Sequence, residues 1–160
     1  MTSNWATFTT AEPDLAKTVE ERFGRFQHHI LATLRKDGSP RTSGLEVRFL
    51  HGEFWLGMMP GSLKARDVLR DPRFAVQANP GDGTGMGGGD VRISGRALLV
   101  EDPEVIASYT DSVQVPDPDD FHLFRTELTE VTRTFIEDEK YLVVQVWKPG
   151  GEPVRTLKRT

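Results

Sequence analysis

The chain has 160 residues, with 20 Lys and Arg against 24 Asp and Glu, which gives a net charge of −4 with histidine neutral. This length predicts one domain over residues 1–160 with a core of its own, and the mild acidity argues against a nucleic-acid-binding protein. The sequence has no cysteine, which excludes disulfides, thiol catalysis and Cys-ligated metal centres. No signal-peptide pattern or bilayer-length apolar run is present, so we expect a cytoplasmic protein that does not enter membranes.

The first third of the chain predicts a helix followed by a three-stranded meander. Apolar residues recur at spacings of three and four over Asp14–His29, which is typical of an amphipathic helix in the N-terminal region, residues 1–29. The period then changes to alternation. Turn dipeptides, Asp-Gly at 37–38 and His-Gly at 51–52, separate three expected strands: Ile30–Arg35, Arg41–Leu50 and Glu53–Met59.

The second hairpin predicts its own register. With the His-Gly dipeptide as its turn, three apolar pairs fall on one face: Phe49 with Phe54, Val47 with Leu56, and Leu45 with Met58. The opposite face places Arg48 beside Trp55, where we expect a cation over an aromatic ring. The same face places Glu46 beside Gly57, whose small size lets a ligand approach the backbone.

Beyond the meander the chain predicts a short helix, two strands, two helices and a last strand: Pro60–Pro72, Phe74–Ala78, Val91–Val100, Pro103–Thr110, Asp119–Phe135 and Tyr141–Trp147. The long helix over Asp119–Phe135 rests on an apolar stripe: Phe121, Phe124, Leu128, Val131 and Phe135. A polar C-terminal tail follows over residues 148–160. About six mostly antiparallel strands with flanking helices predict a mainly β protein, a small closed or split β-barrel.

Two candidate motifs carry little chemistry. Gly83, Gly85 and Gly88 form a G-x-G-x-x-G pattern, but a strand rather than a helix follows it, so we interpret the segment 79–90 as a flexible connector and not as a dinucleotide site. The histidines lack metal-ligand spacing. We expect a turn role for His51 and a helix-surface position for His122.

The segment GSLKAR is more informative. Ser62 is a good N-cap, and Lys64 lies in the first turn of the predicted helix. A helix N-terminus offers unpaired N–H donors and a partial positive charge, so these residues suit a phosphate group. An ordinary capped surface helix with a solvated lysine fits the same residues, and spacing alone favours it.

The order and spacing of three segments resemble the flavin-binding split barrels related to pyridoxamine 5′-phosphate oxidase. These segments are LATLRKDGSP at Leu31–Pro40, SLKARDVLRDPR at Ser62–Arg73 and DVRISGRALLVEDPE at Asp90–Glu104. The resemblance favours the phosphate interpretation of GSLKAR. It implies FMN, or in some branches a deazaflavin coenzyme, bound at the interface of a homodimer.

Carried over position by position, the resemblance implies a cofactor site on two strands and a helix start. Ser62 and Lys64 would hold the phosphate, and the ring and ribityl chain would lie along Thr42–Val47 and across Gly57 and Met58. Leu63 stands where the oxidase has an arginine, with Arg66 the nearest substitute, and Asp90 stands where it has a glutamine. The full set is Thr42, Ser43, Gly44, Leu45, Glu46, Gly57, Met58, Ser62, Leu63, Lys64 and Asp90.

Other departures argue against pyridoxamine phosphate oxidation itself. Thr42 and Val47 replace an arginine and a lysine of the oxidase, and its C-terminal substrate-recognition motif has no clear counterpart. The leading hypothesis is a homodimeric FMN-dependent oxidoreductase acting on an unknown small molecule, with the flavin carrying the two-electron chemistry. Alternatives are a deazaflavin-dependent reductase and a non-catalytic flavin- or tetrapyrrole-binding protein. For Glu46, a salt bridge with Arg48 competes with a role beside the ring.

Overall fold

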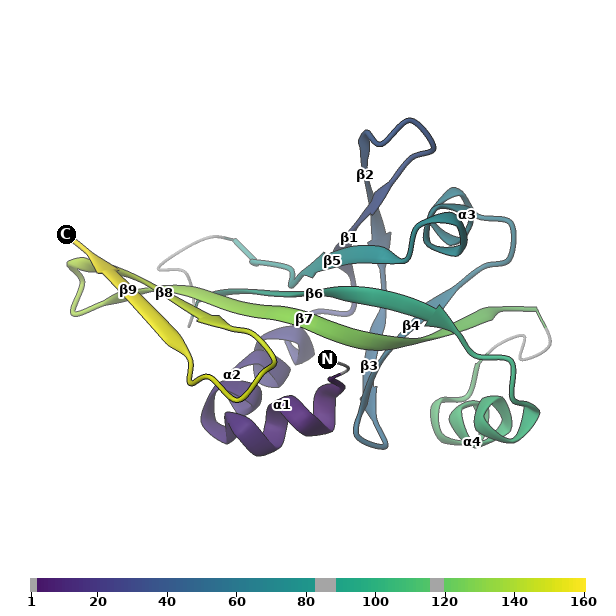
Figure 1. Cartoon of the computed structure of the whole chain (residues 1–160), viewed down its shortest axis with the longest axis horizontal. Coiled ribbons are helices and arrows are strands. Elements are labelled where there is room, and N and C mark those ends of the chain that lie inside the picture. The colour runs from purple at the N-terminus through teal and green to yellow at the C-terminus, as the bar shows by residue number, and fades with distance from the viewer. Residues whose placement is uncertain (1–2, 83–88, 116–119) are drawn as a thin grey trace.

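A computed structural model describes residues 3–82, 89–115 and 120–160 (Figure 1). Its elements in chain order are α1 (Trp5–Ala11), α2 (Pro13–Gly24), β1 (His29–Leu34), β2 (Pro40–Leu45), β3 (Val47–Leu50), β4 (Glu53–Met58), α3 (Leu63–Arg70), β5 (Arg73–Gln77), β6 (Asp90–Leu99), α4 (Pro103–Val113), β7 (His122–Glu137), β8 (Tyr141–Trp147) and β9 (Arg155–Arg159). Gly83, Gly85 and Gly88 lie outside the described residues, so the expectation for the G-x-G-x-x-G pattern stays a prediction.

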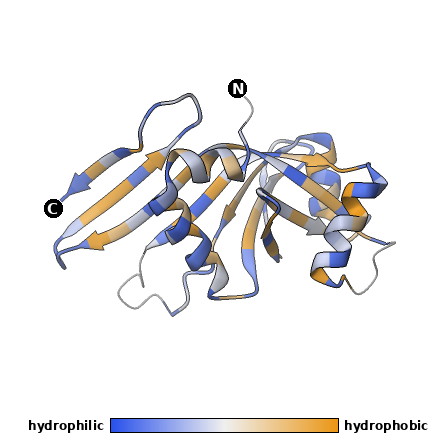
Figure 2. Cartoon of the chain, turned by 90° about the horizontal axis from the view of Figure 1, so that it is seen from below, coloured by the Kyte–Doolittle hydropathy of each residue, from blue (hydrophilic) through white to orange (hydrophobic). Residues whose placement is uncertain are grey.

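The strands form one antiparallel, twisted sheet that does not close. Their order is β2-β1-β5-β6-β7-β4-β3, and β8 and β9 continue from β7. The chain is therefore mainly β with flanking helices, as the sequence predicts, and the split alternative is the one it adopts. Polar and apolar residues alternate along the strands (Figure 2), which is the pattern of strands with one face buried.

The predicted register of the second hairpin is confirmed over its four turn-proximal pairs, from Leu50 with Glu53 to Val47 with Leu56. His51 occupies the turn with φ +53° and Gly52 follows with φ +74°. The prediction of one strand over Arg41–Leu50 is wrong, because the chain leaves the sheet at Glu46. The residues before Glu46 pair with β1, with Leu45 opposite His29, so Leu45 pairs across β1 and not with Met58 as predicted.

The prediction of a helix over Asp119–Phe135 is also wrong, since this segment is most of the 16-residue strand β7. A β-bulge explains the error: Gly95 pairs with Leu128 and Ser94 pairs with Glu130, so Thr129 is an extra residue. The extra residue changes which alternate side chains of β7 face the core. Phe124, Leu128 and Val131 all face the core as a result, at the helix-like spacings of four and three. His122 consequently begins a strand and does not lie on a helix surface.

Two apolar clusters sit on opposite faces of the β3–β4 hairpin. The main core packs Val47, Phe54 and Leu56 against α1, α2 and the central strands, and the smaller cluster packs Trp55 and Leu123 against Tyr109 of α4. Both faces of the hairpin are therefore covered, although the alternation predicts only one as core.

The part of β7 after the bulge forms an arm with β8 and β9, with the C-terminus at its tip (Figure 1), and the loop between β8 and β9 contacts Glu12 at the end of α1. The structure thus has nine strands among the described residues, not about six. Part of the difference is β9, which lies in the tail that the sequence predicts to be polar and irregular. Pairing with β8 supplies its hydrogen bonds, although all five of its residues are exposed.

Candidate functional site

A pocket of about 720 Å³ gathers residues from both halves of the predicted cofactor site. Six of the predicted residues line it: Gly44, Leu45, Glu46, Gly57, Met58 and Lys64. The other lining residues come from the segment after α2, from β3, from the loop after β4, and from α4 and the residues between α4 and β7: Gln27, His28, Arg48, Met59, Tyr109, Val113, Gln114, Val115 and Phe121.

The start of α3 brings a cation to this pocket. Gly61 has φ +77° and makes the turn, and the Oγ of Ser62 caps the helix by accepting from the N–H of Ala65 at 3.3 Å. The Nζ of Lys64 donates to the carbonyl oxygen of Gly44 at 2.7 Å. Burial lowers the pKa of Lys64 because desolvation disfavours its charge. The predicted helix cap and the lysine beside the hairpin are both present.

A buried carboxylate fixes α3 to the sheet. Asp67 accepts from Thr33 Oγ1 at 2.7 Å, from Arg41 Nε at 2.7 Å and from Arg70 at 3.1 Å, and its side chain is 3% exposed. Burial alone would raise the pKa of Asp67, but the hydrogen bonds from these three residues outweigh it and lower the pKa. This network sets the position of Lys64 relative to Gly44.

Glu46 is the centre of the polar wall of the pocket. Gln27 Nε2 donates to its Oε1 at 2.7 Å, His28 Nε2 lies 3.5 Å from the same oxygen, and an Arg48 nitrogen lies 3.8 Å from Oε2. Glu46 therefore forms the expected ion pair with Arg48 and also lines the pocket. The sequence analysis treats the ion pair with Arg48 and a place in the cofactor pocket as alternatives for Glu46, and the structure shows both.

The cation over Trp55 is not Arg48 but Arg125, whose guanidinium carbon lies 5.6 Å from the ring centroid. Trp55 is buried, its Nε1 donates to the carbonyl of Leu50 at 2.7 Å, and its ring lies 5.5 Å from that of Tyr109. The prediction is wrong here because β7 pairs alongside β4 and delivers Arg125 to this face.

Five predicted residues do not line the pocket: Thr42, Ser43, Ser62, Leu63 and Asp90. Ser43 has a buried Oγ with no hydrogen-bond partner, and Leu63 is 55% exposed. Asp90 opens β6 opposite Thr134 and interacts with Arg22. Arg66, the expected substitute for the missing arginine, lines a separate basic cleft beside α3.

The residues that the sequence analysis missed close the pocket from the side of α4. Tyr109, Val113, Val115 and Phe121 provide an apolar and aromatic wall opposite the polar wall of Glu46 and its partners. The apolar positions of α4 indicate a packed helix, but no local signal shows which strands it covers. Among the described residues, no cluster of three His, Asp or Glu side chains is arranged to hold a metal ion, and no helix is long and apolar enough to cross a membrane.

The solved structures that resemble the chain share its fold. PhzG from Burkholderia lata 383, in complex with tetrahydrophenazine-1-carboxylic acid, aligns with a TM-score of 0.64 and 16% identity over 95% of this chain and 91% of its own. HutZ, the heme storage protein from Vibrio cholerae, aligns with a TM-score of 0.56 and 18% identity over 74% of this chain and 89% of its own. A putative pyridoxamine 5′-phosphate oxidase from Listeria innocua aligns with a TM-score of 0.60 and 16% identity over 75% of this chain and 98% of its own.

A search of curated protein sequences finds no significant match. A family model described as pyridoxamine 5′-phosphate oxidase matches residues 15–135, which include α3, the β3–β4 hairpin and every residue that lines the pocket. The chain therefore belongs to the pyridoxamine 5′-phosphate oxidase family.

Proposed function

We propose that the chain is an FMN-dependent oxidoreductase that acts on a small molecule. The observation that carries this proposal is the position of Lys64, which lies at the start of α3 and lines the same pocket as Gly44, Leu45 and Gly57. A cation beside a helix N-terminus suits a phosphate. A pocket with one polar and one aromatic wall suits a flat heteroaromatic ring.

The residues present fit this cofactor in its main features. Lys64 would hold the phosphate beside the helix start that Ser62 caps, whereas Ser43 Oγ is buried away from the pocket and is not assigned to the cofactor. A bound flavin supplies the two-electron chemistry. Gln27, His28 and Arg48 hold the carboxylate of Glu46 in place, and Tyr109, Val113 and Phe121 form an apolar wall opposite it. The chain's own contribution is thus binding and orientation.

Replacing the phosphate's expected partner tests the site. Lys64→Ala should weaken FMN binding about tenfold or more, since one charge-assisted hydrogen bond is worth roughly 1.5–3 kcal/mol. Lys64→Arg should restore most of the affinity, and Lys17→Ala, on the exposed side of α2, should leave it unchanged. Fluorescence titration of FMN measures this. Equal affinity in Lys64→Ala and the parent protein would refute the assigned site.

We further propose a homodimer built on one face of the arm. Strand pairing places Ile136, Leu142, Val144 and Leu157 on the same face, and Ile136 and Leu157 are 45% and 40% exposed. Apolar side chains gathered on an exposed sheet face are typical of a protein interface. A second copy would cover this face.

His28 supports a second candidate, a tetrapyrrole-binding protein without turnover. Its imidazole lines the pocket and is 69% exposed, and imidazole is a common axial ligand of haem iron. Parallel titration with FMN, a deazaflavin coenzyme and haemin separates the candidates. Tight haemin binding that His28→Ala abolishes, together with weak FMN binding, would favour the tetrapyrrole function over the flavin function.

A further inference from the structure

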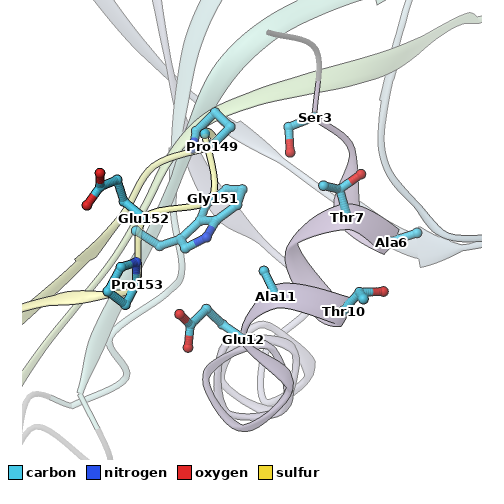
Figure 3. Close-up of a pocket in the computed structure, with 12 residues that line it drawn as sticks. Ser3, Ala6, Thr7, Thr10, Ala11, Glu12, Pro149, Gly151, Glu152 and Pro153 are labelled. Atoms are coloured by element: carbon cyan, nitrogen blue, oxygen red, sulfur yellow. The ribbon is translucent and has the colours of Figure 1, made fainter.

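A second pocket, of about 800 Å³, is lined only by residues outside the family's motif segments and shares no residue with the first. It lies between α1 and the loop that joins β8 to β9 (Figure 3). Ser3, α1 and Glu12 form one side of it, and the segment from Trp147 to Pro153 forms the other. We propose that this pocket binds a small organic amine that carries a flat apolar body.

The back of the pocket is fixed by aromatic packing. Phe8 is fully buried and its ring lies 4.7 Å from that of Trp147, which is itself buried at the end of β8. Trp5 packs on Phe49 at 4.5 Å and holds α1 on the core. One face of α1 is thereby committed to the core, and Thr7 and Ala11 are left on the side toward the loop (Figure 3).

The loop is held in place at both ends by contacts with α1 and with Glu12. Trp147 anchors its start, and at its other end the backbone N–H of Val154 donates to Glu12 Oε1 at 3.1 Å. Gly150 and Gly151 have φ +129° and +85° and give the loop its bend. An added Cβ at either glycine would meet nothing within 4 Å, so the loop has open space beside it. These anchors let the cleft persist without a ligand inside it.

The lining chemistry determines the ligand class. It contains no Lys, Arg or His, and the carboxylate of Glu12 lies between α1 and the loop (Figure 3), so it disfavours phosphates and carboxylates and favours a cation. The carboxylate of Glu152 points outward from the loop (Figure 3). Ala6, Ala11, Pro149 and Pro153 offer an apolar surface for a flat body, and a volume near 800 Å³ is within the range of small-molecule sites.

Ser3 provides an independent indication of a ligand. Its residue is 3% exposed, and its Oγ is buried without a hydrogen-bond partner. Its hydroxyl points into the space between Pro149 and Thr7 (Figure 3). Buried hydroxyls are normally paired, and this oxygen can accept a hydrogen bond from an ammonium group.

Three matched probes test the proposal: phenethylamine, 2-phenylethanol and 3-phenylpropionate, which share a body and differ in charge. Titrations of the full chain are followed by the amide NMR signals of Thr7, Thr10, Gly150 and Gly151. We expect phenethylamine to shift these signals and to bind at least about fivefold more tightly than 3-phenylpropionate, the size of one exposed ion pair. Equal binding of the three probes, no shifts, or shifts confined to Gly57 and Lys64 would overturn the proposal.

Three variants sharpen the result. Glu12→Gln keeps an acceptor for Val154 and removes a charge, so it should reduce the preference for the amine and leave 2-phenylethanol binding unchanged. Ser3→Ala should weaken amine binding about threefold. Ala11→Trp should fill the cleft and abolish binding of all three probes, because Ala11 is exposed and points toward the loop (Figure 3). Unchanged probe affinities in a folded Ala11→Trp protein would place the binding elsewhere and refute the site.

Discussion

His29 is a buried imidazole at the start of β1 that is held in its neutral form. Its Nδ1 accepts from the backbone N–H of Asn79 at 2.9 Å, and its ring lies 4.9 Å from that of Phe23. Burial lowers the pKa of His29. Hydrogen bonds with the backbone of Phe26 and Phe23 raise the pKa, but the burial, helped by the nearby His28, outweighs them.

This gives a prediction of how stability depends on pH. The folded protein resists protonation of His29, whereas the unfolded chain accepts a proton near the ordinary pKa of about 6.5. The contribution of His29 should therefore be complete above that pH and decrease as the pH falls through it. Urea unfolding between pH 8 and pH 5 measures the change. His29→Gln should have lower stability at pH 8 and a flatter pH profile, and a profile parallel to the parent's would contradict the assignment.

Asp67 allows a second prediction at the scale of one residue. Asp67→Asn removes the charge that Arg41 and Arg70 share and should cost about 2–3 kcal/mol of unfolding free energy, because both arginines are left facing a neutral, buried amide. Asp71→Asn is the matched control, since its partner Arg73 is 68% exposed and the loss should be smaller. Chemical denaturation of both variants measures the difference. A loss in Asp67→Asn no greater than in Asp71→Asn would show that the network contributes little.

At the scale of the secondary-structure elements, the β-bulge between β6 and β7 requires glycine at position 95. A Cβ on Gly95 would overlap the carbonyl oxygen of Glu127 and lie 3.1 Å from the Cα of Leu128. The two strands lie too close there for any side chain, so glycine is required by the close approach of the neighbouring backbone.

Gly95→Ala should therefore destabilise the protein by about 3 kcal/mol or more, within the range of severe packing changes. Gly24→Ala is the control, because a Cβ on Gly24 meets nothing within 4 Å and alanine favours the helix end of α2. Thermal unfolding of the two variants compares them. A Gly95→Ala protein as stable as Gly24→Ala would mean that the strands separate easily at the bulge.

At the scale of the whole molecule, the proposed dimer depends on the exposed apolar face of β7, β8 and β9. Ile136→Glu places a charge on this face and should convert the proposed dimer to a monomer, because burying an unpaired carboxylate in an interface is costly. Thr156→Glu, on the opposite face of β9 opposite Gln145, should leave the dimer intact. Light scattering after size exclusion reads the mass, and a dimeric Ile136→Glu protein would place the interface elsewhere.

The amino-acid pattern alone determined the local parts of this protein. The His-Gly turn fixed the β3–β4 register because side-chain period and turn length leave one consistent pairing, and the Ser62 cap with Asp71-Pro72 bounded α3. The order of these motifs also indicated the family. They depend on contacts between residues near in sequence, so a linear pattern is enough to find them.

The tertiary structure decided the rest. The bulge in β7 spaces its buried apolar residues as in a helix, and only the pairing with β6 shows that the segment is a strand. Arg125 rather than Arg48 lies over Trp55, and α4 closes the pocket around Glu46, because strands and helices distant in sequence were brought together by packing. Such contacts depend on how the whole core excludes water, and no short segment of the chain encodes them.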